Sequence, residues 1–244
     1  MPLDIGGVAT ALLGHYGEEP WWWPRLLPEI PREDELLLGG VLCQQSRWER
    51  VEQVLLRLQA ADLVTWPALA AADPVVLTPM LNGAAYPPTR ARLLPQLAAA
   101  VLDAGGMPAI LAAADPRAAL LALPQVGPET ADTLLAFTGT SVPVVDAYLR
   151  RVLGRLGLVD PTSTYADLRA QLAAMDVGLP WDQFHVLLVE HGIHHCLTGR
   201  PLCDVDGHPR RDYAEPRKCV AHCPPCRGCP LSDVCPRRGV VAAG

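Results

Sequence analysis

Seven of the eight cysteines lie between residues 196 and 235, near the C-terminal end of the chain. Among them, Cys219, Cys226, Cys229 and Cys235 follow the spacing Cys-x6-Cys-x2-Cys-x5-Cys. Four thiolates converging from a short loop are what an iron–sulfur cluster or a structural zinc ion requires. The spacing leaves both metals open. We expect the segment to be a loop that is organised by metal rather than by an apolar core.

A second cysteine pair leaves the first ligand open. Cys196 and Cys203 repeat the first half of the spacing, as though a segment had been inserted or duplicated between the two copies. We favour Cys219 as the first ligand because the four-cysteine module then stays intact. Cys196 is the alternative, and Cys203 and Cys223 become additional thiols.

The turn at residues 123–127 has a sequence that can bind a phosphate. Gly127 is followed by a helical pattern over 130–137, and the N-terminus of a helix presents unpaired backbone N–H groups. These groups and the helix dipole favour an anion without any basic side chain. The sequence therefore predicts a phosphate site at this turn.

Asp146 follows an apolar run and begins the next predicted helix, residues 147–158. A carboxylate beside an apolar wall can act as a base or stabilise a developing cation. A purely structural N-cap aspartate has the same sequence pattern. Both interpretations remain open at this stage.

The elements that must position these residues are predicted to be helices. Abundant Ala and Leu, scarce aromatic residues and proline punctuation favour an all-α fold. The first 33 residues are rich in proline and are expected to be irregular. Apolar residues recur at helical spacing in several further segments, namely 35–58 with a break at 44–48, 66–80, 89–103, 107–113, 116–123, 165–175 and 181–192.

Charge and length set further limits. The chain has 244 residues, which is enough for one large or two small domains, and its net charge is −6. Lys218 is the only lysine, so any mechanism that needs a lysine has one candidate. The cysteine-rich tail carries more basic than acidic residues. This excess of positive charge is explained either by binding to a nucleic-acid backbone or by solubility alone. No signal peptide or membrane-spanning stretch is present, so we expect a cytoplasmic protein without a membrane partner.

Together these motifs, from about residue 35 to residue 235, resemble the helix-hairpin-helix DNA glycosylases, specifically the endonuclease III branch with its iron–sulfur loop. The sequences of these motifs are similar to those of bacterial 3-methyladenine glycosylases and their endonuclease III-like relatives. The resemblance rests on VLCQQSRWERV (41–51), LPQVGPETAD (123–132), VVDAYLRRVLGRLG (144–157), FHVLLVEHG (184–192) and CVAHCPPCRGCPLSDVC (219–235).

The resemblance implies two helical domains. Residues 34–141 would form a six-helix barrel with the helix-hairpin-helix motif, and residues 1–33 would join 142–244 in a second domain with the cluster loop at 196–235. The active site would lie in the cleft between them, with Asp146 and Glu129 facing across it. The implied cofactor is a 4Fe-4S cluster, with zinc as the alternative.

The resemblance also implies a mechanism and a set of DNA contacts. A glycosylase flips a damaged nucleotide out of the duplex and cleaves the bond between base and sugar. Asp146 would match the family aspartate, and Gln44 would enter the gap left by the flipped base. Further DNA contacts would come from Gln125, Gly127, Thr130, Lys218 and Arg227. The expected substrate is double-stranded DNA containing an alkylated purine or an oxidised base, bound by a monomer at the nucleoid.

Two departures from the family pattern matter. Bifunctional endonuclease III enzymes attack the sugar with a hairpin lysine, but the matching residue here is Glu129, and a carboxylate cannot form an imine. We therefore expect a monofunctional glycosylase with weak or absent lyase activity, unless the amine of Pro2 serves after removal of Met1. Gln125 stands where the hairpin usually has its first glycine. The alternative function is a non-catalytic DNA-structure-binding protein with a structural metal site.

Overall fold

The protein is described here by a computed structural model that covers residues 4–17, 25–199, 201–203 and 228–240. Within these ranges the regular structure is helical, and the only β pairing is an isolated bridge between Asn82 and Ala84. The predicted all-α fold class is confirmed. Among the described residues, no helix is long and apolar enough to cross a membrane.

Short helices of the described ranges follow one another with proline and glycine at many of their ends. They are α1 (Ile5–Tyr16), α2 (Arg32–Cys43), α3 (Trp48–Ala60), α4 (Trp66–Ala70), α5 (Pro74–Met80), α6 (Pro87–Asp103), α7 (Met107–Leu111), α8 (Pro116–Leu121), α9 (Pro128–Phe137), α10 (Ala147–Leu156), α11 (Tyr165–Ala173) and α12 (Trp181–His194).

The chain forms two compact units. The first consists of Met1–Trp22 and Ser141–Gly244, and the second consists of Trp23–Thr140. The sequence placed residues 23–33 with the first unit, whereas here they belong to the second. The reason is local: Leu27 and Ile30 are buried, and the Leu26 N–H donates to the carboxylate of Glu35 at 2.7 Å.

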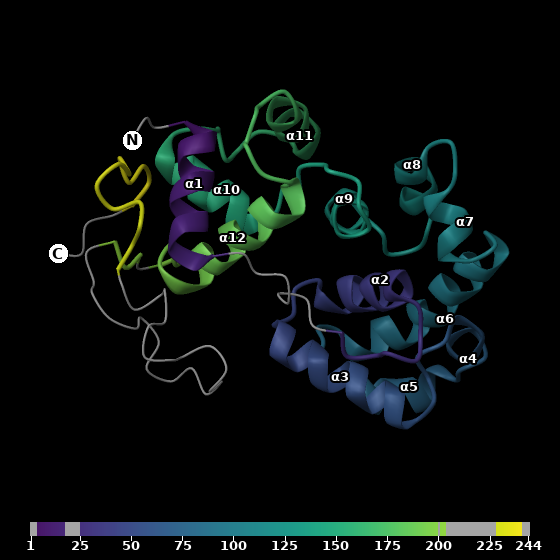
Figure 1. Cartoon of the computed structure of the whole chain (residues 1–244). Helices are drawn as coiled ribbons and strands as arrows, with labels where there is room; N and C mark the ends of the chain where they lie inside the picture. The colour runs from purple at the N-terminus through teal and green to yellow at the C-terminus, as the bar shows by residue number, and fades with distance from the viewer. Residues whose placement is uncertain (1–3, 18–24, 200, 204–227, 241–244) are drawn as a thin grey trace. The chain divides into compact units, whose positions relative to one another are not determined.

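In the first unit, α1 and α10 both pack against α12 (Figure 1). Their apolar faces meet in one core around Leu12, Leu153 and Phe184, which are almost fully buried. Gly192 makes part of this packing possible, because a Cβ there would collide with the ring of Tyr148 from α10. The core fixes the start of α10, where Asp146 stands.

Helix α1 corrects the expectation that the first 33 residues are irregular. The Asp4 side chain caps the helix by accepting from the Gly7 N–H at 2.7 Å, and Gly17 ends it with a φ of 78°. Val8 and Leu12 are buried on one face. The proline-rich stretch that follows α1 obscured this short amphipathic pattern.

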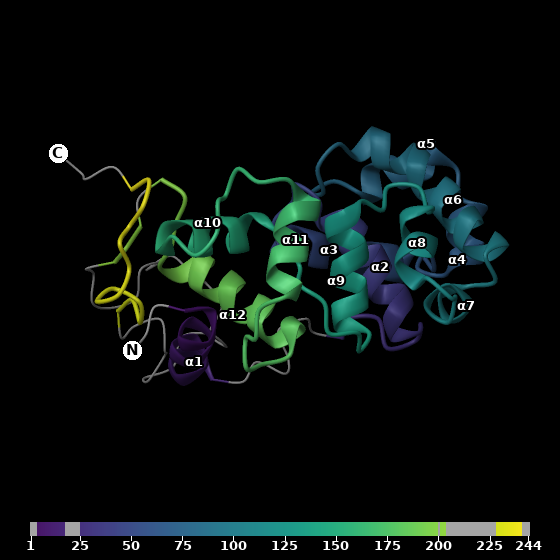
Figure 2. The same ribbon diagram turned by 90° about the horizontal axis from the view of Figure 1, so that it is seen from above.

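In the second unit, α2 and α9 lie side by side, as both views show (Figures 1 and 2). Helix α6 packs against α4 and α5. The segment 66–80, expected as one helix, is two: Asp73 accepts from the Val75 N–H and Pro74 begins α5. An Asp-Pro step is a start signal for a new helix, and it wins over the apolar periodicity here.

Helices α8 and α9 form a hairpin around the turn at 123–127. Arg117 of α8 donates to both carboxylate oxygens of Asp132 in α9, at 2.7 Å and 3.1 Å. The Asp132 side chain is fully buried, whereas that of Arg117 is 30% exposed. This paired contact holds the two helices at the angle that presents the turn.

Candidate active site and metal-binding loop

Asp146 is the N-cap residue of α10. Its Oδ1 atom accepts from the Leu149 N–H at 2.7 Å, and the residue is only 7% exposed. Val144 and Val145, directly before it, are almost fully buried. The carboxylate therefore stands at a helix N-terminus beside an apolar wall, as the sequence pattern indicates.

The environment changes the acidity of Asp146. Burial raises the pKa of the carboxyl group to about 6, although hydrogen bonds from backbone N–H groups, led by that of Leu149, and the charge of Arg151 oppose the shift. A carboxyl group with a pKa near neutrality can hold or release a proton under physiological conditions. The N-cap role of Asp146 is therefore compatible with a chemical role of the same side chain.

The hairpin turn carries glutamine at the position where the family pattern has its first glycine. Gln125 has a φ of +66°, in the left-handed region that glycine adopts without strain. Gly127 is the N-cap residue of α9, and no side chain caps this helix end. The positive end of the α9 dipole is therefore not covered by a capping side chain, as a phosphate-binding turn requires.

Gln44 lies between α2 and α3 and is tied to the hairpin. Its Nε2 donates to the Gln125 carbonyl at 2.8 Å and to Thr130 Oγ1 at 3.0 Å. The carbonyl of Gln44 in turn accepts from Arg90 at 2.9 Å. The structure thus brings together three residues that the sequence assigns to DNA contact, with Thr130 buried and used as an internal partner.

Glu129 lies in the first turn of α9, exposed, where a negative charge is favoured by the helix dipole. It belongs to the second unit, whereas Asp146 belongs to the first. Each carboxylate is thus held by the packing of its own unit.

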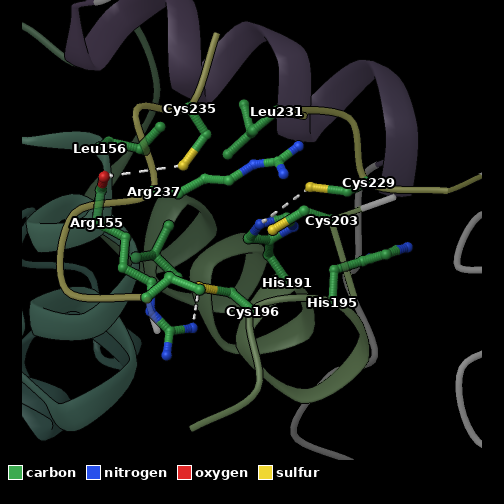
Figure 3. A pocket seen from close by; sticks show the side chains of 12 residues that line it. Arg155, Leu156, His191, His195, Cys196, Cys203, Cys229, Leu231, Cys235 and Arg237 are labelled. Atoms are coloured by element: carbon green, nitrogen blue, oxygen red, sulfur yellow. Dashed lines mark hydrogen bonds between the residues drawn. The ribbon is translucent and has the colours of Figure 1, made fainter. Parts of the chain in front are cut away.

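The cysteines that lie together in the structure differ from the predicted ligand set. Of the favoured ligands, Cys219 and Cys226 lie outside the described residues, as do Cys223, Lys218 and Arg227. Cys229 and Cys235 are described, and they line one pocket together with Cys196 and Cys203 (Figure 3).

Helices α10 and α12 hold the pocket in place. Arg155 of α10 donates to Cys196 Sγ at 3.2 Å (Figure 3). It also donates to the Leu197 carbonyl at 2.7 Å, and its own carbonyl accepts from the Arg238 N–H. Arg151, one turn earlier, donates to the Cys196 carbonyl at 2.6 Å. Arginine side chains thus join the cysteine loop to the helix that begins at Asp146. The sequence analysis did not single out these two arginines, although their spacing of four residues places them on one helix face.

The donor set fits a thiolate-bound cluster. The pKa of the Cys229 thiol is raised to about 12, mainly by burial; a hydrogen bond from the backbone of Leu231 opposes the shift, and the neighbouring thiols of Cys203, Cys196 and Cys235 contribute to it. Thiols close enough to repel one another as anions are a soft ligand set suited to iron–sulfur clusters or zinc. Within the described part of the chain, no three His, Cys, Asp or Glu side chains have the arrangement that holds a metal ion. The thiols of Cys196, Cys203, Cys229 and Cys235 would therefore have to move closer together to bind a metal centre.

Histidines that the sequence analysis did not assign surround the same pocket. His191 and His195 line it, and their rings stack with centroids 5.6 Å apart. Burial lowers the pKa of His191 well below its usual range, and the neighbouring His195 and His15 act in the same direction. The available signal was the grouping of histidines directly before Cys196.

The helical fold, the hairpin and the buried aspartate define a helix-hairpin-helix protein of base excision repair. The family model described as HhH-GPD superfamily base excision DNA repair protein matches residues 38–175, more than half of the chain. The chain belongs to this superfamily, and it is similar to the endonuclease III-like proteins within it.

Sequence relatives point the same way. Over 204 residues, the chain is 29% identical to a Methanocaldococcus jannaschii protein whose name provisionally assigns it as a DNA repair glycosylase. The match covers 79% of this chain and 88% of the relative. Endonuclease III of Sulfolobus acidocaldarius is 31% identical over 87 residues, which cover 35% of this chain and 39% of that protein.

Solved structures share the fold. A non-covalent endonuclease III–DNA complex matches with a TM-score of 0.68 at 22% identity, covering 83% of this chain and 92% of that chain. The H. pylori 3-methyladenine DNA glycosylase bound to 1,N6-ethenoadenine matches with a TM-score of 0.62 at 23% identity, covering 78% and 97%. The predicted endonuclease III type of fold is confirmed.

Proposed function

We propose that this protein is a DNA glycosylase that flips a damaged base out of duplex DNA and removes it by hydrolysis. The observation that carries the proposal is Asp146, a buried carboxyl group at the start of α10 with a pKa raised to about 6. In a member of a base excision repair superfamily, such a group would supply the negative charge that chemistry on the sugar needs.

The role of Asp146 follows from the reaction. Breaking the bond between base and sugar leaves positive charge on the sugar, and a carboxylate beside it stabilises that charge. The same group can accept a proton from an attacking water. Both roles need the ionised form, which predominates above about pH 6 given the raised pKa. The apolar wall of Val144 and Val145 strengthens the interaction by excluding water.

The hairpin would supply a phosphate contact. Gly127 leaves the N-terminus of α9 without a side-chain cap, and Gln125 keeps the turn tight by its left-handed backbone. Gln44 would fill the space left by the flipped base after exchanging its bonds to Gln125 and Thr130 for bonds to DNA. Lys218 and Arg227 remain proposed backbone contacts by virtue of their charge.

Glu129 supports hydrolysis without a lyase step. An exposed carboxylate in the first turn of α9 cannot attack the sugar to form an imine. A negative charge here also favours a cationic base, so we propose alkylated purines ahead of oxidised bases. The H. pylori structural relative, whose crystal contains 1,N6-ethenoadenine, is consistent with a modified purine as substrate.

For the metal centre we propose a 4Fe-4S cluster held by Cys196, Cys203, Cys229 and Cys235. These four thiols line one pocket, whereas the set with Cys219 and Cys226 was proposed from spacing alone. Residues 204–228 would then be an insertion between the second and third ligands. The cluster would supply a rigid anchor for the basic loop.

Single serine replacements decide between the two ligand sets. With the pocket set, Cys196→Ser and Cys203→Ser lose iron and the absorbance near ~400 nm that iron–sulfur proteins show, while Cys219→Ser and Cys226→Ser keep both. The reverse pattern would establish the set predicted from spacing. Zinc in place of iron would give a colourless protein.

A panel of duplexes tests the function itself. Wild-type protein and Asp146→Asn are incubated with DNA containing 3-methyladenine, 1,N6-ethenoadenine, thymine glycol or uracil, and the released base is measured. We expect release of at least one base by the wild-type protein and not by the variant. Tight binding without any release would instead identify a non-catalytic DNA-structure-binding protein.

A further inference from the structure

A buried hydrogen-bonded group connects α1 to the cysteine pocket. Tyr16, the last residue of α1, has its hydroxyl oxygen 2.7 Å from His195 Nδ1 and 3.2 Å from His191 Nδ1. The second ring nitrogen of His191, Nε2, lies 4.0 Å from Cys229 Sγ (Figure 3). A continuous path of polar contacts therefore runs from Tyr16 through His191 to a thiol of the pocket.

The path is closed to solvent. Tyr16 is 6% exposed, His191 2% and His195 1%. Polar atoms in such surroundings must find partners within the protein, because an unmade hydrogen bond costs on the order of 1–3 kcal/mol. The hydroxyl group of Tyr16 and the imidazole rings of His191 and His195 must therefore satisfy one another, and this requirement determines which atom carries each proton.

The proton count allows two arrangements. The Tyr16 hydroxyl has one proton, and a neutral imidazole has one N–H. If Tyr16 donates to His191 Nδ1, the ring carries its proton on Nε2, which faces Cys229 Sγ. If Tyr16 donates to His195 instead, His191 presents a lone pair to the sulfur. A metal-bound thiolate is an acceptor only, so the first arrangement satisfies both groups and the second opposes two lone pairs.

We propose that Tyr16 and His191 are positioning residues for the metal centre: the Tyr16 hydroxyl holds His191 in the tautomer whose Nε2–H donates to the Cys229 thiolate. The inference rests on the proposed cluster. A hydrogen bond to a ligating sulfur withdraws negative charge from it, which favours the reduced cluster and strengthens its retention. The same bond anchors α1 to the C-terminal loop.

Tyr16→Phe tests the proposal with the smallest change, the loss of one hydroxyl. We expect a more negative reduction potential of the bound cluster, and loss of its visible absorbance to an iron chelator faster by roughly 10-fold or more. Tyr165→Phe is the matched control, because it removes a hydroxyl from the same unit at a residue that does not line the pocket. Equal potentials and equal rates for both variants and the wild-type protein would overturn the proposal.

His191→Phe shows whether Tyr16 acts through His191. The variant keeps a ring of similar size without a donor, and it should shift the potential in the same direction. Tyr16→Phe should then add little further change, since the two residues form one path. A full additional shift from Tyr16→Phe in the His191→Phe protein would contradict the proposed path. If His191→Phe does not fold, the comparison of Tyr16→Phe with Tyr165→Phe decides alone.

Failure of the proposed function and failure of this inference are distinguishable. Wild-type protein that contains no iron–sulfur cluster would overturn this inference together with the cofactor proposal. Protein that contains the cluster but releases no base would overturn the enzymatic proposal only, and the potential and chelation measurements would still decide the roles of Tyr16 and His191.

Discussion

Asp146 Oδ1 accepts a hydrogen bond of 2.7 Å from the backbone N–H of Leu149, so the proposed catalytic carboxylate also caps the helix that carries it. The two interpretations that the sequence left open are therefore compatible. The cap fixes the orientation of the carboxylate, and burial keeps its pKa near 6. Positioning and acidity come from the same local structure, since both depend on the start of α10 within the apolar core.

The substitution Asp146→Asn separates the cap from the charge. Asparagine is as good an N-cap residue as aspartate, so below about pH 4, where the carboxyl group of folded Asp146 is protonated, we expect the free energy of unfolding to change by less than about 1 kcal/mol. Base release in single turnovers should fall by roughly 100-fold or more, because the carboxylate is lost. Equal rates for variant and wild-type protein would remove Asp146 from the mechanism.

The raised pKa of Asp146 gives activity and stability opposite pH dependence. Base release should rise with pH through about 6, as the carboxyl group ionises. The folded protein holds this proton more tightly than the unfolded chain, whose aspartate has a pKa near its ordinary value of 3.8. The contribution to stability is therefore complete below about pH 4 and is lost as the pH rises through about 6.

Rate profiles of base release and denaturant midpoints measured between pH 4 and pH 8 check both slopes. Asp146→Asn is the control, because an amide does not titrate in this range. The free energy of unfolding of the wild-type protein, taken relative to that of the variant, should therefore decrease between pH 4 and pH 6. A wild-type rate that is flat through pH 6 would contradict the assignment.

The parts of the fold that sequence predicts well are those with local signals. The hairpin and the helix after Asp146 form from short, continuous motifs, and their residues adopt the expected conformations. Helix α1 was missed because its apolar face precedes a proline-rich stretch, and the break at Asp73 was hidden by continuous apolar residues. Competing local signals of this kind are resolved only by packing.

The cysteine pocket shows where sequence reasoning reaches its limit. Spacing grouped Cys229 and Cys235 with near neighbours in the chain, whereas the structure gathers them with Cys196 and Cys203. Arg155 joins these segments, because its side chain donates to Cys196 Sγ and its carbonyl accepts from the Arg238 N–H. Such long-range contacts leave no periodic pattern in the sequence.

The pair Arg117–Asp132 should determine the stability of the hairpin. Arg117→Met leaves the fully buried Asp132 carboxylate without its strongest donor, so we expect a loss of about 3 kcal/mol in the free energy of unfolding. Chemical denaturation measures it. The double variant Arg117→Met, Asp132→Leu should recover part of the loss, because no uncompensated charge remains. Additive losses would mean that the pair is not coupled.

Because the hairpin has no lysine, the protein should form no covalent bond to abasic DNA. We expect no protein–DNA adduct after borohydride treatment of the wild-type protein, and Glu129→Lys should produce one, because it places an amine at the matching position. Gel electrophoresis detects the adduct. An adduct with the wild-type protein that disappears in Lys218→Ala would instead assign the lyase step to Lys218.

His185 should make the protein sensitive to acid. Burial lowers the pKa of this histidine in α12 to about 4, against a smaller opposing effect of Asp182. The unfolded chain binds the proton more tightly, so stability that is complete above about pH 6.5 falls as the pH decreases toward 4. The contribution of His185 should decrease by on the order of 2 kcal/mol between pH 7 and pH 5. Denaturation should therefore show that the wild-type protein loses stability relative to His185→Leu as the pH decreases over this range, and an equal pH dependence of the two proteins would show that His185 does not cause the acid sensitivity.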